Sequence, residues 1–166
     1  MGLLTREPRA DDEPALADAH AEAWRVGYGD LLEPAVLDTA LASIRSGWPE
    51  WFADDGPRVT TLLALEVDGA VAGFIHFGPS DAGAEIHRLN LHPSAWGSGG
   101  ADLLVGAALA VLTERGVPLV HLWTHAGAGR ARRFYEQAGF VLSGREREEE
   151  VHGATLPVVE YTRPIA

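Results

Sequence analysis

The sequence predicts a mixed α/β fold in which a predominantly antiparallel central sheet carries helices on both faces. Strand-like apolar segments alternate along the chain with longer stretches that have helical periodicity. The dipeptide Asp68-Gly69 separates two strand-like segments, which is the strongest short signal of a β-hairpin. The expected order is strand, two helices, hairpin, strand–helix–strand–helix and a final strand pair. Such an order places helices on both sides of one sheet.

Two helices are expected before the hairpin. The first begins after Asp11 or Asp12, either of which can cap a helix with Pro14 in its first turn. The second is expected over residues 34–44, with Gly47 just beyond its end. The aromatic residues that follow are expected to form a separate short piece.

The other elements are expected where apolar runs are bounded by glycine, proline or polar clusters. Strands are predicted at 3–6, 59–67, 70–77, 86–91, 117–124, 140–148 and 155–162, and helices directly after residue 100 and at 128–138. No repeat or change of composition divides the chain. A single domain over residues 1–166 is therefore expected.

The composition narrows the classes of partner. A net charge of −11 repels phosphate backbones, so a nucleic-acid partner is not expected. No apolar run approaches the length of a membrane span, and the first residues turn acidic and polar before any apolar core, unlike a secretory signal. Without cysteine there is no disulfide or thiol chemistry. These features favour a cytoplasmic location with no membrane partner.

A glycine-rich loop after the fourth predicted strand is the most informative segment. Pro93 ends the strand because it has no N–H, and Gly97, Gly99 and Gly100 then lead directly into an apolar helix. Such a loop leaves free N–H groups at the positive end of a helix dipole, which suits a pyrophosphate. Asp102 stands where a dinucleotide fingerprint needs glycine, and a P-loop needs a lysine that this chain lacks. The loop is predicted to bind a different phosphorylated cofactor.

This loop resembles the acetyl-coenzyme A loop of the GNAT N-acetyltransferase superfamily, Gln/Arg-x-x-Gly-x-Gly/Ala. Gly99 and Ala101 match the pattern, and Trp96 stands at the Gln/Arg position. A second block resembles the family signature Asn-x-x-Ala-x-x-Phe-Tyr followed by Gly-Phe, with Ala128 at the Asn position. Its matching residues are Ala131, Phe134, Tyr135, Gly139 and Phe140. The likeness extends loosely over nearly the whole chain.

The resemblance implies an acyl-CoA N-acyltransferase fold and a reaction in which an amine attacks acetyl-CoA directly in a ternary complex. Loop amides would hold the pyrophosphate, and the strand edge would hold the pantetheine arm. The residues implied for binding acetyl-CoA are Leu89, Asn90, Leu91, Trp96, Gly97, Ser98, Gly99, Gly100, Ala101, Asp102, Ala128, Arg130, Ala131 and Phe134. The acceptor would be a small-molecule amine or a peptide amine. The oligomeric state stays open, with a homodimer among the expectations.

Three residues are candidates for proton transfer. Tyr135 matches the family tyrosine that protonates the departing thiolate, and a phenol with a pKa near ~10 suits that role. Glu85 precedes Trp96 by eleven residues and is the candidate general base, with a pKa that burial is expected to raise. His87 lies two positions further along the strand and is the alternative base.

Aromatic and acidic residues indicate the acceptor. The resemblance implies that the early helical region lines the acceptor pocket, where Trp24 and Tyr28 could hold an ammonium by cation–π contact. The acidic charge favours a small cationic molecule, which the acidic run 146–150 could help to steer. No metal is expected, because His121 and His125 share a strand face without further ligands. Two alternatives remain: a non-catalytic acyl-CoA-binding or regulatory module, and an enzyme using a different acyl-CoA.

Overall fold

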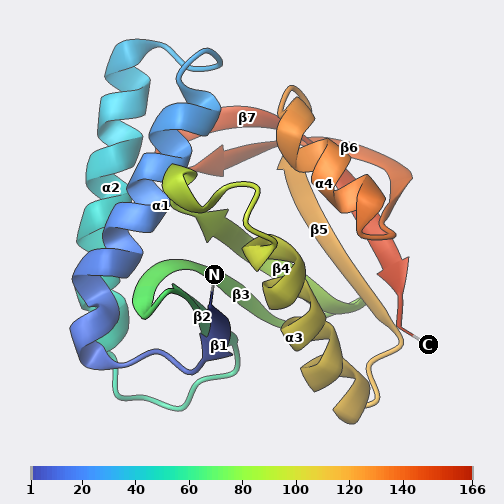
Figure 1. The fold of residues 1–166 in the computed structure, drawn as a ribbon. Coiled ribbons are helices and arrows are strands. Elements are labelled where there is room, and N and C mark those ends of the chain that lie inside the picture. Colours follow the sequence, from blue (N-terminus) through green and yellow to red (C-terminus); the bar gives the residue numbers. More distant parts are fainter. Residues whose placement is uncertain (1, 166) are drawn as a thin grey trace.

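A seven-stranded sheet forms the centre of the fold, with strand order β1-β2-β3-β4-β5-β7-β6 (Figure 1). The computed structural model describes residues 2–165, so the first and last residues of the predicted domain lie outside it. The strands are β1 (Leu3–Arg6), β2 (Thr61–Val67), β3 (Ala70–Ser80), β4 (Gly83–Leu91), β5 (Leu119–His125), β6 (Val141–Val151) and β7 (Ala154–Pro164). Every neighbouring pair is antiparallel except β4 and β5.

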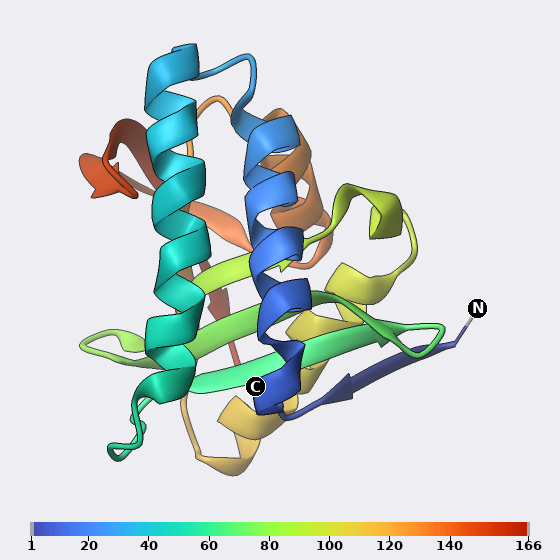
Figure 2. The same ribbon diagram turned by 90° about the vertical axis from the view of Figure 1, so that its left-hand side faces the viewer.

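Two pairs of helices cover the two faces of this sheet. The helices α1 (Glu13–Tyr28) and α2 (Pro34–Ala53) pack on one face, and α3 (Gly100–Glu114) and α4 (Gly129–Gln137) lie on the other (Figures 1 and 2). Each face has its own cluster of buried apolar side chains. Short 3-10 turns, η1 (Ala10–Asp12) and η2 (Pro93–Ala95), precede α1 and follow β4. The predicted fold class is confirmed.

Two tight hairpin turns connect neighbouring strands. Asp68 and Gly69 have φ angles of 51° and 84°, and His152 and Gly153 have φ angles of 51° and 81°. Positive φ at both central residues is the requirement of a two-residue type I′ turn, whose twist matches that of the strands. The predicted Asp68-Gly69 hairpin is confirmed. The second turn brings His152 over α1, with its ring centroid 5.2 Å from that of Trp24.

The second helix is longer than the sequence predicts. It continues without a break through Gly47 and Pro49 to Ala53, so the separate aromatic piece is part of α2. Glycine and proline both disfavour a helix interior. Burial of Trp48, which is 5% exposed and packs edge-on against Phe74, offsets that preference. Tertiary packing therefore overrides the local signals for a helix end.

The strands β4 and β5 pair over only part of their length. Their Cα partners run from Ala84 opposite Val120 to Ile86 opposite Leu122, and beyond this point the strands diverge (Figure 1). The later part of each strand therefore has one edge without a strand partner. These two free edges hold the candidate site.

A β-bulge lies at the point of divergence. His76 on β3 is opposite Arg88, but Phe77 is opposite Ile86, so His87 is the extra residue of β4. A bulge redirects side chains at such positions. The sequence predicted a regular strand here and did not indicate the bulge.

No helix of residues 2–165 is long and apolar enough to cross a membrane.

Candidate active site

The free edge of β4 presents the main-chain groups of alternate residues. The amide of His92 donates a 2.7 Å hydrogen bond to the carbonyl of Ala72 on β3, which fixes the pairing pattern of these antiparallel strands. Because such pairing alternates, Asn90 turns its main-chain groups toward β3, whereas Leu89 and Leu91 turn theirs toward β5. Of the three residues predicted to bind the pantetheine arm, Leu89 and Leu91 offer the strand edge and Asn90 does not.

Trp96 connects the end of β4 to the loop and to α4. Its indole Nε1 donates a 2.9 Å hydrogen bond to the Leu91 carbonyl. The guanidinium of Arg130 lies 4.3 Å from the centroid of the indole ring, a cation–π distance. The residue that departs from the family pattern therefore occupies one acceptor of the strand edge and holds two parts of the site together.

The glycine-rich loop has the conformation expected of an anion site. Gly97 and Gly99 have φ angles of 79° and 88°, and Gly99 is the N-cap of α3. The Gly100 amide donates to Ser98 Oγ at 3.1 Å, and a side chain at Gly100 would collide with Leu65. Within the part of the chain that is described, the loop amides left without a partner are those of Gly97, Gly99, Ala101 and Asp102.

These amides lie at the positive end of the α3 dipole. Several free N–H groups at a helix N-terminus are suited to a pyrophosphate. The glycines also leave the backbone open to close approach. The residues present therefore fit the diphosphate of coenzyme A, although Asp102 adds an exposed carboxylate to the first turn.

The second predicted block lies on α4, beside the loop. Ala128 is the N-cap of this helix, and Ala131 and Phe134 are partly buried against the apolar cluster on the α3 side of the sheet. Arg132 has a structural role, because it donates to Tyr161 Oη at 3.0 Å and to the Ala126 carbonyl at 2.7 Å. Arg130, over Trp96, is placed differently and stays exposed.

Tyr135 is buried between α4 and the sheet. Its ring lies edge-on to those of Phe134 and Phe140, at centroid distances of 5.4 and 5.7 Å. Burial raises the pKa of the phenol above its ordinary value, and the nearby Tyr28 phenol raises it further. The hydroxyl therefore keeps its proton at neutral pH, as a proton donor must.

Tyr28 lies between two other rings at the end of α1. Its ring centroid is 4.3 Å from that of Trp24 and 5.7 Å from that of His125. Burial raises the pKa of Tyr28 to about 12. Trp24 is only 5% exposed and belongs to the core, so Tyr28 is the better placed of the two predicted acceptor contacts.

His125 at the end of β5 is not one of the three residues that the sequence analysis selected for proton transfer. Its Nδ1 accepts a 2.8 Å hydrogen bond from the amide of Gly127, and burial lowers the pKa of the imidazole. A neutral ring that accepts at Nδ1 carries its proton on Nε2. His125 therefore presents an N–H donor beside Tyr28.

Glu85 begins a row of ionisable side chains that crosses four strands. Its Oε2 lies 3.1 Å from His87 Nδ1, and its Oε1 lies 3.6 Å from His121 Nε2 on β5. His121 Nδ1 lies 3.0 Å from Glu160 Oε2 on β7, which is 3.3 Å from Arg145 Nη1 on β6. Both predicted bases, Glu85 and His87, therefore belong to one hydrogen-bonded pair at the bulge.

The expectation that burial raises the pKa of Glu85 is wrong. The hydrogen bond with His87 lowers this pKa and outweighs the opposing effect of desolvation. The partners His121 and Glu160 were not predicted, because only the register of the parallel β4–β5 pair brings His121 opposite Glu85. Among residues 2–165, no group of three or more histidine and carboxylate side chains is placed to hold a metal ion.

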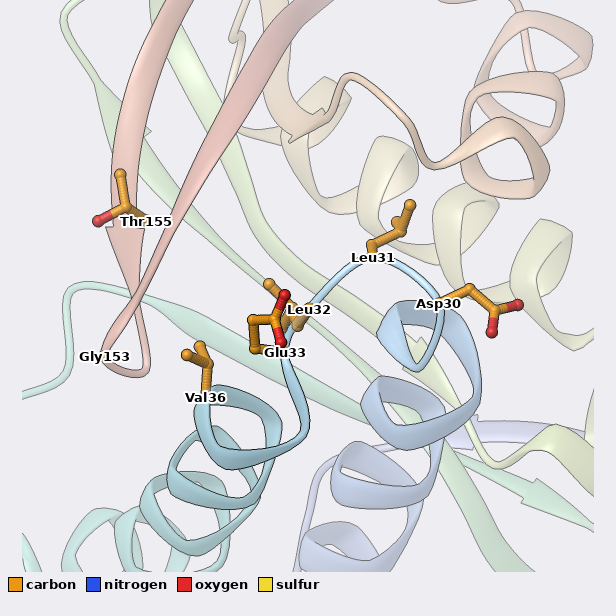
Figure 3. Close-up of a pocket in the computed structure, with 7 residues that line it drawn as sticks. All are labelled: Asp30, Leu31, Leu32, Glu33, Val36, Gly153 and Thr155. Carbon is orange, nitrogen blue, oxygen red and sulfur yellow. The ribbon is translucent and has the colours of Figure 1, made fainter.

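A cavity of about 460 Å³ opens between the α1–α2 connection and the β6–β7 hairpin (Figure 3). Its lining residues are Asp30, Leu31, Leu32, Glu33, Val36, Gly153 and Thr155. In Figure 3, Glu33 and Val36 lie on the side of the Gly153 turn, and the Asp30 carboxylate points away from it. The amides of Leu31 and Leu32 donate to the Tyr28 carbonyl at 3.0 and 3.1 Å, so the cavity adjoins the Tyr28 end of α1.

Comparison with known proteins gives one consistent result. The family model described as acetyltransferase (GNAT) family matches residues 14–140. A mycothiol acetyltransferase from Brachybacterium faecium is 33% identical over 135 residues, which cover 76% of this chain and 39% of that protein. A protein named probable N-acetyltransferase from Mycobacterium tuberculosis is 25% identical, with 96% of this chain and 92% of that protein covered. The chain thus spans less than half the length of the first relative.

Solved structures resemble this fold over nearly the whole chain. The PaiA N-acetyltransferase from Thermoplasma acidophilum, in complex with coenzyme A, has a TM-score of 0.77, 20% identity and coverage of 96% of this chain and 98% of its own. A GCN5-related N-acetyltransferase from Rhodopseudomonas palustris has a TM-score of 0.79, 17% identity and coverage of 99% and 96%. At these identities the likeness establishes the fold.

Proposed function

Because the chain belongs to the acetyltransferase (GNAT) family, we propose that it moves the acetyl group of acetyl-CoA to a primary amine. The observation that carries this proposal is the free edge of β4 directly beside four unpartnered loop amides. Together they offer an extended row of donors and acceptors that ends at the positive pole of α3. A pantetheine arm with a pyrophosphate at its end has that shape and polarity.

The residues that would hold acetyl-CoA follow from this arrangement. The amides of Gly97, Gly99, Ala101 and Asp102 would bind the pyrophosphate. The main-chain groups of Leu89 and Leu91 would pair with the pantetheine amides, apart from the Leu91 carbonyl that Trp96 occupies. Arg130, held over Trp96, would add positive charge next to the phosphates in a protein of net charge −11.

When bound, acetyl-CoA supplies an acetyl thioester. In the proposed reaction the acceptor amine first loses a proton to the Glu85–His87 pair, and its nitrogen then bonds to the acetyl carbon. The C–S bond breaks, and Tyr135 donates a proton to the departing thiolate. Its raised pKa keeps that proton available at neutral pH. The products are an N-acetyl amide and free CoA.

The acceptor is proposed to be small and to arrive as an ammonium cation. Such a cation is attracted by the net charge of −11. Tyr28 offers an aromatic face at the end of α1, and the cavity beside it includes the carboxylate of Glu33. The acidic run 146–150 lies on the exposed edge strand β6, where Arg147 pairs with Glu149 at 2.9 Å. The charge of Glu149 in this run contributes to the raised pKa of Tyr28, so steering is assigned to Glu33 together with Glu149.

Two measurements test the function separately. Calorimetry with acetyl-CoA measures binding, and thiol release during incubation with a panel of primary amines measures transfer. Binding together with acetylation of at least one amine supports the proposal. Binding without transfer to any amine would favour a non-catalytic acyl-CoA-binding module, and transfer only from longer acyl-CoA donors would change the donor. The cytoplasmic location, the homodimer and the single domain over residues 1–166 stay predictions.

A further inference from the structure

A second cavity, of about 470 Å³, lies between α2, α1 and the sheet, on the face opposite α3. It is bounded by the C-terminal half of α2, the lower part of the teal helix in Figure 2, and by side chains of β3 and β4. Trp48, Trp51 and Phe74 supply apolar aromatic walls. Its size is in the range of small-molecule sites, which combine apolar walls with a few polar groups.

Arg88 on β4 is the basic residue that lines this cavity. The Arg88 residue is exposed to solvent, and partial burial of its guanidinium lowers the pKa of that group. No charged group among residues 2–165 contributes to that change, and none of the ion pairs there includes Arg88. A guanidinium that lines a cavity without a carboxylate partner is open to a bound anion, which would accept charge-assisted hydrogen bonds from it.

Three histidine side chains line the same cavity, and because they are uncharged, its positive charge comes from Arg88. The pKa of His76 and that of His152 are each lowered to about 4, and that of His20 is lowered too, mainly by desolvation and also by the charge of Arg88. All three rings are therefore neutral at neutral pH. His20 Nδ1 accepts from Trp48 Nε1 at 3.2 Å, which leaves its proton on Nε2. Neutral imidazoles of this kind can donate N–H groups without adding charge.

The acidic groups of the cavity lie at the C-terminal end of α2 and at its C-cap. These are Glu50 and Asp54. Asp54 Oδ1 accepts from the Gly56 amide at 3.0 Å, and Arg58 donates to the Asp54 carbonyl at 2.8 Å, so a second guanidinium lies beside this end. One free arginine together with nearby carboxylates favours a singly charged anion over a phosphate dianion. A carboxylate fits this charge and the planar guanidinium fork.

The cavity lies next to the proposed site of proton transfer. His76 lines the cavity, and its ring centroid lies 5.3 Å from that of His87, which is hydrogen-bonded to Glu85. Arg88 follows His87 directly on the bulged strand. A molecule anchored at Arg88 on this face therefore has the Glu85–His87 pair next to it.

We propose that this cavity binds a carboxylate group of the acceptor through Arg88, so that the acceptor is an amino carboxylate. This inference rests on the proposed acetyl transfer, and it narrows the acceptor from a simple ammonium cation to a molecule that carries both an ammonium and a carboxylate. The aromatic walls of Trp48 and Phe74 would contact the apolar part of the molecule. The ammonium at its other end would reach the Glu85–His87 pair, while the carboxylate remains on the guanidinium.

The first experiment measures anion binding without any reaction. In the ¹⁵N-labelled protein, the Arg88 Nε–H resonance is followed during titration with 3-phenylpropionate, with the uncharged 3-phenylpropanol and with inorganic phosphate. The Arg88→Gln variant assigns the resonance. We expect a saturable shift with 3-phenylpropionate alone. No saturable shift with any probe, or tighter binding of phosphate, overturns the carboxylate site.

The second experiment compares acetylation of matched amines. L-phenylalanine is paired with 2-phenylethylamine, and 4-aminobutyrate and 6-aminohexanoate are paired with butylamine and hexylamine. For at least one pair, kcat/KM should be about 10- to 100-fold higher with the carboxylate, as expected for a charge-assisted hydrogen bond. Arg88→Gln should abolish this preference, and Arg88→Lys should retain part of it. Arg45→Gln, at an exposed arginine of α2 outside the cavity, is the matched control.

The outcomes separate this inference from the proposed function. A carboxylate preference that survives in Arg88→Gln, or saturable binding at Arg88 with no preference in any pair, overturns the acceptor assignment. If no amine of any kind is acetylated while the Arg88 resonance still responds to 3-phenylpropionate, the acetyltransferase function fails instead. Calorimetry with acetyl-CoA should give the same affinity in wild type and Arg88→Gln, which shows that the variant is folded.

Discussion

The indole Nε1 of Trp96 donates a 2.9 Å hydrogen bond to the main-chain carbonyl of Leu91, the last residue of β4. This bond ties the start of the glycine-rich loop to the strand edge that diverges from β5. It also places the indole under the guanidinium of Arg130 on α4. The Trp96 side chain thus contacts both blocks of the family pattern.

Replacement of Trp96 by phenylalanine tests this role. Trp96→Phe keeps an aromatic ring for Arg130 but removes the N–H donor, so the Leu91 carbonyl loses its partner. We expect the free energy of unfolding to fall by about 0.5–1.5 kcal/mol, the usual contribution of one hydrogen bond. Acetyl-CoA affinity should change no more than a few-fold in calorimetry. A large loss of affinity with unchanged stability would show instead that the indole contacts the cofactor.

Substitution of Gly99 tests the anion site most directly. Its φ of 88° is a conformation that β-branched residues avoid, and a side chain there would also block approach to the loop amides. Gly99→Val should weaken acetyl-CoA binding by about tenfold or more in calorimetry. The control is Gly106→Ala, in the middle of α3, where a Cβ would meet no atom within 4 Å; this variant should bind normally and be slightly more stable. Unchanged affinity in Gly99→Val would contradict the site.

The sequence predicted the parts of the fold whose signals are local. The Asp68-Gly69 turn and strand β1 are local in this sense, since a positive-φ turn and an apolar strand depend on their own residues. The glycine-rich loop belongs to the same class. The continuation of α2 through Pro49 was not predictable, because burial of Trp48 against Phe74 decides it.

The same division between local signals and tertiary contacts applies to the candidate site. Glu85 and His87 could be proposed from their spacing, but the effect of one on the pKa of the other depends on a bulge that no local signal revealed. His121 joins Glu85 only through the register of two strands separated by α3. Arg88 received no prediction, because an arginine on a strand gives no sign in the sequence that its guanidinium lies in a cavity without a partner.

Replacement of Tyr135 and replacement of Tyr28 by phenylalanine should change the kinetic constants differently. Tyr135→Phe removes the proposed proton donor to the thiolate, so kcat should fall by about 10²-fold or more with little change in acetyl-CoA affinity. Tyr28→Phe keeps the aromatic face, so it should change the acceptor KM slightly and kcat little. Steady-state kinetics with the best amine of the panel, together with calorimetry, separates the two. A kcat of Tyr135→Phe close to wild type would remove Tyr135 from the mechanism.

The pH–rate profile distinguishes the two candidate bases. Hydrogen bonding to His87 lowers the pKa of Glu85, so this carboxylate does not change charge between pH 5 and 8. An acidic limb of kcat/KM in that range should therefore come from an imidazole. It should persist in Glu85→Gln and disappear in His87→Gln, and His121→Gln serves as the control for the second histidine near Glu85. Loss of the limb in Glu85→Gln alone would assign the base to Glu85.

The neutral histidines around Arg88 predict how stability depends on pH. Burial lowers the pKa of His76 and of His152 from 6.5 to about 4 in the folded chain, with contributions from Arg88 to both and from His87 and Arg58 to His76. Between pH 6.5 and 4 the unfolded chain binds protons at these rings and the folded chain does not. The stability is therefore complete above pH 6.5 and is lost as the pH falls toward 4.

Replacement of these two rings by a side chain that does not titrate should remove that dependence. Each ring should contribute about 1–2 kcal/mol of the loss, less than its full shift implies, because both stay partly accessible to water. Urea unfolding of wild type, His76→Gln, His152→Gln and the double variant is followed by tryptophan fluorescence from pH 7 to pH 4. From pH 7 to pH 4, the loss of unfolding free energy should be about 2–4 kcal/mol smaller in the double variant than in wild type. In the control His92→Gln, whose ring lies outside the cavity, the pH dependence should be the same as in wild type. Arg88→Gln should reduce the loss as well, since removing its charge lets the pKa of both rings return toward 6.5. A wild-type pH dependence that is the same in the double variant would show that these imidazoles are not held neutral in the folded protein.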